Sequence, residues 1–193
     1  MDKLISQTTL DKFYREELKK NGKERIEQIK DEQKFKHSLK EKTSIFLCHS
    51  HLDKTTVNKI VMLFANLNID IYVDWMDSTL PKKTDKSTAS AIKRKINESD
   101  KFLFLATYNA LRSKWCNWEL GLAYSSKGES DFAILPIESR SGNWIGSEYL
   151  QLYPEMKIDI ENNRIESLTS YDIKINYFDE KKITLNEWIK RPK

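Results

Sequence analysis

The chain after residue 42 is built from short apolar runs separated by longer amphipathic stretches. This alternation is typical of strands and helices that take turns around a parallel sheet. The sequence therefore predicts an α/β domain with a central parallel sheet. With 193 residues, the chain has room for one such domain and an appendage, but not for two large domains.

The expected elements can be placed along the chain. We expect strands at 44–48, 69–73, 102–105 and 132–137, and an edge strand at 173–175. Helices are expected between the first four strands, and a last helix at 185–190 that Trp188 and Ile189 attach to the sheet. The first two helices carry apolar faces formed by Val57, Ile60, Val61, Phe64 and Leu67, and by Ala89, Ile92 and Ile96.

Residues 1–42 are expected to form a helical arm, and residues 43–193 the main domain, whose most specific motifs lie at 43–139. Apolar residues of the arm recur at helical spacing. Asn21 and Gly22 predict a break between two helices, because both residues tolerate the left-handed conformation. Since so thin an apolar stripe cannot fold alone, the arm either packs on the main domain or pairs with a second copy.

The formal net charge of +4 comes largely from lysines in the arm. These lysines are interleaved with acidic residues and lack an aromatic stacking platform, so they indicate a solvated helical face and no nucleic-acid partner. No apolar run approaches the roughly 20 residues of a membrane span, and the N-terminus has no secretory core. We therefore expect a cytoplasmic protein with no membrane partner.

The two cysteines lie in apolar surroundings, Cys48 in the first strand and Cys116 on a helix. Both are interpreted as small core residues. No metal site is expected, because structural zinc needs four well-spaced ligands.

Glu119 is a carboxylate within an otherwise apolar helical face. Its neighbours three and four residues away are Trp115, Cys116, Leu122 and Ala123, and none of them can neutralise it. Desolvation should raise the pKa of such an acid, which suits a general acid/base or a group that stabilises a developing cation. The alternative is a glutamate with no chemical role.

Ligands of open parallel sheets bind outside the carboxyl ends of the strands. The loops expected at that edge are 49–50, 74–87 and 107–113. Glu119 follows the last of these loops by one to two helical turns, so it can face the same crevice.

Four stretches, in this order and spacing, resemble TIR (Toll/interleukin-1 receptor) domains, especially the NAD-cleaving bacterial and plant-like branch. They are 45–53 for the first strand and helix start, 71–75 for the second strand, 113–120 for the catalytic helix and 134–137 for the fourth strand. Residues 76–87 occupy the place of the long connecting loop called the BB loop. The catalytic glutamate of the family falls on Glu119, and its tryptophan on Trp115.

The resemblance implies a flavodoxin-like fold with helices on both faces of the sheet. It also implies an enzyme that cleaves the bond between nicotinamide and ribose in NAD, giving nicotinamide and ADP-ribose or cyclic ADP-ribose. In that chemistry, Glu119 would stabilise the positive charge that develops on the ribose. Trp115 would stack on an aromatic ring of the nucleotide, although a place in the core is its alternative.

The chain has five glycines, and none directly follows an expected strand. No Gly-rich phosphate turn is therefore available, and NAD is expected as a consumed substrate with no resident cofactor. Lys82 and Lys83 are candidates for phosphate contact, with solvated loop charges as their alternative.

The remaining candidate substrate contacts lie after the first two strands. His49 and Ser50 can line the nicotinamide side of the pocket or serve as turn and cap residues. Asp74 and Trp75 can contact the ligand or anchor the loop.

Two further residues lie close to these candidates. Phe46 is a further candidate for substrate contact, although a core position fits it better. Asp53 is expected to cap a helix.

The leading hypothesis is thus an NAD-consuming signalling enzyme, plausible in bacterial antiphage defence. Its partners would be other TIR surfaces in self-association and an effector protein reached through the nucleotide product. A noncatalytic adaptor that acts through TIR–TIR contacts is the alternative. A nucleoside deoxyribosyltransferase-like enzyme is a weaker third option.

Overall fold

The computed structural model describes residues 4–36, 43–74, 86–139, 148–158 and 168–191. Its strands are β1 (Ile5–Ser6), β2 (Ser44–Cys48), β3 (Asp70–Tyr72), β4 (Lys101–Ala106), β5 (Phe132–Glu138), β6 (Glu155–Ile158), β7 (Ile173–Asn176) and β8 (Lys182–Thr184). The α-helices are α1 (Gln7–Lys36), α2 (Lys54–Asn66), α3 (Lys86–Glu98), α4 (Tyr108–Arg112), α5 (Lys114–Lys127) and α6 (Leu185–Lys190). Short 3-10 turns are η1 (His51–Asp53), η3 (Glu129–Asp131) and η4 (Glu148–Leu152).

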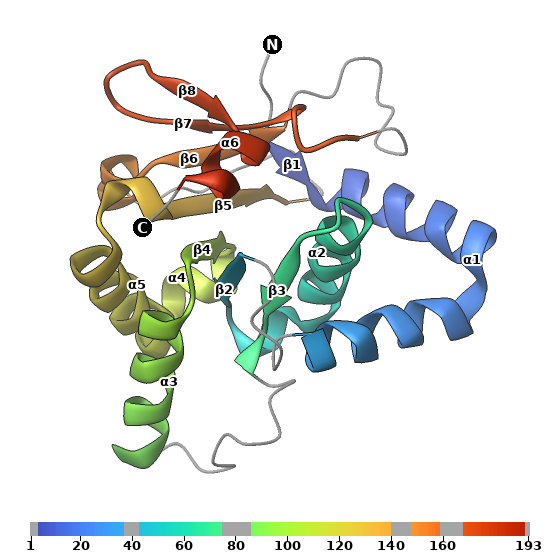
Figure 1. Ribbon diagram of the computed structural model, residues 1–193, viewed down its shortest axis with the longest axis horizontal. Helices are drawn as coiled ribbons and strands as arrows, with labels where there is room; N and C mark the ends of the chain where they lie inside the picture. Colours follow the sequence, from blue (N-terminus) through green and yellow to red (C-terminus); the bar gives the residue numbers. More distant parts are fainter. Residues whose placement is uncertain (1–3, 37–42, 75–85, 140–147, 159–167, 192–193) are drawn as a thin grey trace.

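The strands form one sheet in the order β3-β2-β4-β5-β6-β7-β8, and β1 pairs separately with β5 (Figure 1). Strands β2 to β6 run parallel to one another, whereas β7 is antiparallel to β6 and β8 is antiparallel to β7. The predicted α/β class and the parallel centre of the sheet are thereby confirmed. The first four predicted strands correspond to β2, β3, β4 and β5.

Both faces of the sheet are buried, and β2 shows this alternation directly. Ile45 and Leu47 belong to one apolar cluster, which α1, α2 and α6 cover. Phe46 and Cys48 belong to a second cluster, to which α3 and α5 contribute. A strand covered on both sides reads as a continuous apolar run, and this is why β2 could be recognised in the sequence.

The strand predicted at 173–175 is present as β7, but its predicted place at the edge of the sheet is wrong. β7 pairs with β6 on one side and with β8 on the other, so β8 lies at the edge. β6 and β8 were not predicted, because they are only four and three residues long and are bordered by polar residues. The predicted last helix is confirmed as α6, and its Trp188 is fully buried.

The N-terminal segment packs on the rest of the molecule. Leu10, Phe13 and Ile26 of α1 are buried in the same cluster as the apolar face of α2. β1 adds to the sheet at the carboxyl end of β5, where Ile5 pairs with Ile137. The predicted break in the arm is confirmed at Gly22, whose φ of 71° and ψ of 167° interrupt α1 and change its direction (Figure 1).

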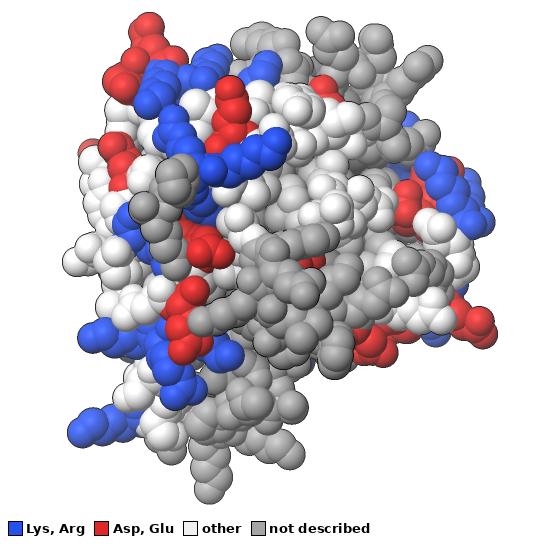
Figure 2. Space-filling model, in the orientation of Figure 1, with Lys and Arg blue, Asp and Glu red and all other residues white. Residues whose placement is uncertain are grey.

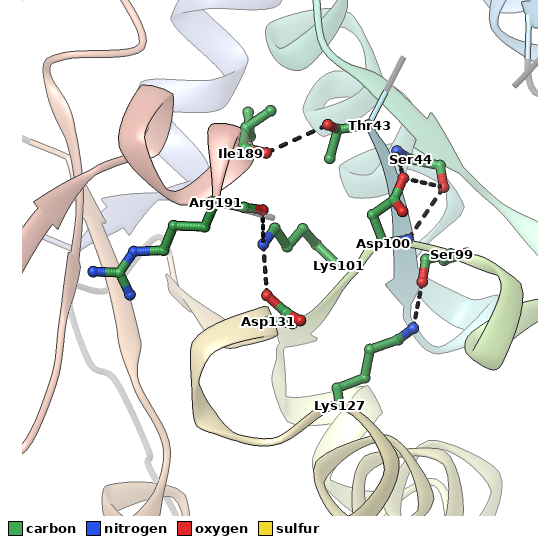
Figure 3. A network of polar contacts seen from close by, with 9 residues as sticks. All are labelled: Thr43, Ser44, Ser99, Asp100, Lys101, Lys127, Asp131, Ile189 and Arg191. Carbon is green, nitrogen blue, oxygen red and sulfur yellow. Dashed lines mark hydrogen bonds and ion pairs between the residues drawn. The ribbon is translucent and has the colours of Figure 1, made fainter. Parts of the chain in front are cut away.

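A polar network ties the C-terminal segment to the amino end of β4 (Figure 3). The buried ammonium group of Lys101 lies 2.5 Å from Asp131 Oδ1 and donates to the Arg191 carbonyl at 3.2 Å. Asp100 accepts a hydrogen bond from the backbone N–H of Ser44 at 2.9 Å. These contacts lie at the opposite end of the strands from the carboxyl edge, so they fix the scaffold without entering that edge.

On the face shown in Figure 2, basic and acidic side chains are interspersed over β7, β8 and α3. Among the helices of the described segments, none has the length and apolar character needed to span a membrane.

Candidate active site

Three chain segments meet beyond the carboxyl ends of β2, β3 and β4. In the parallel register, Phe46 of β2 lies opposite Tyr72 of β3, and Cys48 lies opposite Phe104 of β4. The residues that follow these strands therefore emerge together at one edge, as the order of the elements requires. They include His49, Asp74 and Thr107.

Glu119 lies behind this edge on α5. The helix begins after Ser113, whose hydroxyl accepts a hydrogen bond from the Cys116 N–H at 3.2 Å, so Glu119 falls in the second turn. Its side chain is buried, with 7% relative exposure. Desolvation raises the pKa of Glu119 to about 8; Cys116 and Asp74 add to the rise, and a hydrogen bond from Cys48 opposes it.

Cys48, the last residue of β2, packs beneath α5. Its thiol is fully buried and donates to the Cys116 carbonyl, with 3.7 Å between sulfur and oxygen. Burial raises the pKa of the Cys48 thiol well above its ordinary value, and contacts with Cys116 and Glu119 raise it further. The thiol is therefore a neutral group beside the Glu119 carboxyl group.

His49 joins the segment after β2 to the segment after β3. Its Nδ1 lies 2.9 Å from the Leu47 carbonyl, and its Nε2 lies 3.4 Å from Asp74 Oδ1. The imidazole is almost fully buried, while Asp74 is partly exposed. Ser50 has the cap role that was one of its two alternatives, because its hydroxyl accepts a hydrogen bond from the Leu52 N–H at 3.3 Å.

Asp53 occupies the N-cap position of α2, as expected, although its side chain makes no cap hydrogen bond. Instead, Asp53 accepts hydrogen bonds from the Thr107 hydroxyl and, at 2.7 Å, from Asn109 Nδ2. The carboxylate thus binds the segment after β4 to the start of α2. Thr107 and Asn109 had not been singled out, and their position just after a strand was the available signal.

Trp115 lies on α5, four residues before Glu119, and is 37% exposed. That exposure is inconsistent with its alternative as a core aromatic. Trp118 is exposed to a similar degree, and the two rings meet edge to face with centroids 5.3 Å apart. Such a pair offers a surface for another ring. Trp118 was not among the predicted contacts.

The other candidates lie apart from this edge or outside the described residues. Phe46 is fully buried and stacks on Phe102 with centroids 5.6 Å apart, so it belongs to the core beneath the site. Trp75, Lys82 and Lys83 lie outside the described residues.

Comparison with known proteins decides the family. Residues 45–167, more than half of the chain, match the TIR domain family. The chain belongs to the TIR domain family. The match includes Glu119 and the rest of α5.

Two curated proteins are similar to this TIR domain. A "Probable 3' cyclic ADP-D-ribose synthase ThsB'" from Bacillus cereus (strain MSX-D12) is 30% identical over 165 residues, which cover 83% of this chain and 82% of the relative. A "Putative cyclic ADP-D-ribose synthase TIR2" from Cytobacillus dafuensis is 34% identical over 116 residues, or 52% of this chain and 31% of the relative. The chain therefore spans most of the first protein but under a third of the second.

The site of this TIR domain combines a buried carboxyl group, a neutral thiol and an exposed indole pair. Among the described residues, His, Cys, Asp and Glu side chains form no group of three or more that could hold a metal ion. The arrangement can stabilise a positive charge at Glu119 once the carboxyl group ionises, and can offer stacking one helical turn earlier, at Trp115.

Proposed function

We propose that this TIR domain consumes NAD by cleaving the bond between nicotinamide and ribose. The products are nicotinamide and either ADP-ribose or cyclic ADP-ribose. The observation that carries the proposal is the buried carboxyl group of Glu119 behind the carboxyl edge of the sheet. The names of the two relatives, a "Probable 3' cyclic ADP-D-ribose synthase" and a "Putative cyclic ADP-D-ribose synthase", support the same chemistry.

Loss of nicotinamide leaves positive charge on the ribose, as in glycoside cleavage. An ionised Glu119 stabilises this charge, and one acid suffices because nicotinamide leaves as a neutral base. With a pKa of about 8, the carboxyl group is mostly protonated near pH 7 in the free protein. The cationic nicotinamide ring of NAD favours the ionised form, so substrate binding itself prepares the group.

The substrate contacts are proposed around this carboxylate. Trp115 stacks on an aromatic ring of the nucleotide, which its exposure permits. His49, Ser50 and Asp74 line the nicotinamide side, and Phe46 supports them from the core. Trp75 is a further proposed contact of NAD, and Lys82 and Lys83 are proposed contacts of its phosphates.

The enzyme is proposed to act in the cytoplasm without a resident cofactor, as part of antiphage signalling. A nucleotide product would carry the signal to an effector protein. Self-association through TIR surfaces would complete the pocket.

The test is nicotinamide release from NAD by the purified protein, measured by chromatography at rising protein concentration. We expect Glu119→Gln to lose at least about a hundredfold in rate, since electrostatic stabilisation of a transition state commonly contributes that much. Glu129→Gln, which removes an exposed carboxylate close to the end of the same helix, is the control and should retain full activity.

Unchanged activity in Glu119→Gln would contradict the proposal. Absence of release at every concentration that forms an assembly would favour the adaptor. An adaptor has no need of a desolvated acid beside exposed tryptophans, and for that reason the enzyme is preferred. Release of nucleobase from deoxynucleosides, but not from NAD, would favour the transferase.

A further inference from the structure

Exposed rings and cations surround the corner between α4 and α5. Arg112 is the last residue of α4, and Lys114 is the first residue of α5. Trp115 and Trp118 follow on α5, and all four residues are exposed. The sequence from 108 to 118 contains no acidic residue, so no carboxylate of this segment opposes the positive charge.

We propose that this corner binds the adenosine diphosphate part of NAD, with the adenine ring on the indole pair and the diphosphate beside Arg112 and Lys114. The inference deepens the proposed function and rests on it for the identity of the substrate. In that function, the bond between nicotinamide and ribose lies at Glu119, which is only 7% exposed. The adenine end of NAD then extends toward solvent, where Trp115 lies one helical turn earlier on α5.

The two indoles offer a ring surface with a fixed geometry. Their centroids are 5.3 Å apart and their planes differ by 87°, so the edge of one ring meets the face of the other. This contact orients both rings, while 37% of Trp115 and 40% of Trp118 remain exposed. A nucleobase stacks readily on an exposed aromatic face, because every base has a π-face of its own.

The guanidinium group of Arg112 is available to an anion. Its central carbon lies 5.3 Å from the centroid of the Tyr108 ring, a cation–π contact that holds the group without neutralising it. Within the described segments, neither Arg112 nor Lys114 forms an ion pair with a carboxylate. A guanidinium group can donate to two phosphate oxygens at once, whereas an ammonium group acts as a point charge.

Hydrogen bonds fix the backbone of the corner. Asn117 donates from Nδ2 to the carbonyls of Leu111 at 3.0 Å and Ser113 at 2.9 Å. These two residues flank Arg112. The amide oxygen of Asn117 accepts a hydrogen bond from the Tyr149 hydroxyl at 2.7 Å. The main chain that carries Arg112 is therefore held in place before a ligand arrives, which lowers the entropic cost of binding.

The experiment is a calorimetric titration of the full chain with ADP, followed by nicotinamide release from NAD. We expect Trp118→Ala and Arg112→Gln each to weaken ADP binding about tenfold, the usual order for a lost stacking or charge-assisted contact. The KM for NAD should rise by a similar factor, with kcat changed less than about twofold. Trp118→Phe, which keeps a ring, should retain most of the affinity.

Two controls remove an exposed arginine and an exposed ring elsewhere. Arg15→Gln lies on α1, on the other face of the sheet from α5, and Phe178→Ala lies between β7 and β8. Both should bind ADP as the wild type does. An equal loss in Arg15→Gln would overturn the inference, because it would mean that only the overall charge attracts the nucleotide.

Wild-type affinity in folded Trp118→Ala and Arg112→Gln would also overturn the inference, as would a wild type that does not bind ADP. ADP lacks the bond between nicotinamide and ribose, so this titration does not depend on catalysis. ADP binding at the corner without nicotinamide release from NAD would therefore end the proposed function and leave the nucleotide site in place.

Discussion

The carboxyl group of Glu119 destabilises the folded protein when it loses its proton. Its apolar neighbours on α5 made this burial predictable from the sequence, because residues three and four positions apart share a helical face. The contact with Cys48 was not predictable. It depends on which strand passes beneath α5 and on which of its faces Cys48 occupies, and neither is encoded in local spacing.

The raised pKa of Glu119 makes stability depend on pH. Between the ordinary value of 4.5 and the folded value of about 8, the folded chain holds a proton that the unfolded chain has lost. Stability should therefore fall as pH rises through this window, by up to about 1.4 kcal/mol per pH unit. The side chain in Glu119→Gln does not ionise. We therefore expect the stability of this variant, relative to the wild type, to increase from pH 5 to pH 8.

Denaturant unfolding of both proteins at pH 5, 6.5 and 8 provides the measurement. The difference in free energy of unfolding should widen with pH, while Glu129→Gln should remain parallel to the wild type. Parallel curves for Glu119→Gln would show that the carboxyl group ionises normally in the folded protein.

At the scale of the elements, strands buried on both faces were the easiest to predict. β2, β4 and β5 read as continuous apolar runs, whereas β6 and β8 are short and β1 has only two residues. Their pairing, β1 with β5 and both β6 and β8 with β7, determines these three strands more than their own sequences do. The break in α1 was predictable because Asn21-Gly22 is a local signal.

Gly22 is expected to be intolerant of a side chain. Its φ of 71° with ψ of 167° lies in a region that is nearly restricted to glycine, and a Cβ there would meet no atom within 4 Å. The cost of Gly22→Ala, about 1–3 kcal/mol, would thus come from the backbone alone.

Gly121→Ala is the matched control for that substitution. Gly121 lies within α5, and a Cβ there also meets nothing within 4 Å. A gain of up to about 1 kcal/mol is expected, because alanine favours helix. Thermal unfolding of both variants measures the two effects, and equal changes would contradict the backbone argument.

At the scale of the whole molecule, the sequence left open whether the arm packs on the domain or on a second copy. Its helical spacing defines an apolar stripe but not the surface that receives it. The described part of the arm packs on α2 through apolar residues and one largely buried ion pair, Asp11 with Lys59.

Removing Asp11 should weaken this docking. Asp11→Ala leaves Lys59, whose side chain is 8% exposed, without that carboxylate. A loss of about 3 kcal/mol is expected, at the lower end for a broken buried pair because Asp11 is partly exposed. Replacing both residues, Asp11→Leu with Lys59→Met, should recover most of the loss.

Glu16→Ala on the same helix is the control, since its pair with Lys19 lies at the surface, and it should leave unfolding in denaturant unchanged. An Asp11→Ala protein as stable as the wild type would mean that water or another group serves Lys59 equally well.

The pairing of Ile5 with Ile137 also sets an order of events on the ribosome. Synthesis proceeds from the N-terminus, so β1 emerges long before the strand that receives it. The apolar stripe of α1 likewise waits for α2. Until α2 has been made, the nascent arm presents Leu10, Phe13 and Ile26 to the solvent and to chaperones, and a product truncated before α2 would remain in that exposed state.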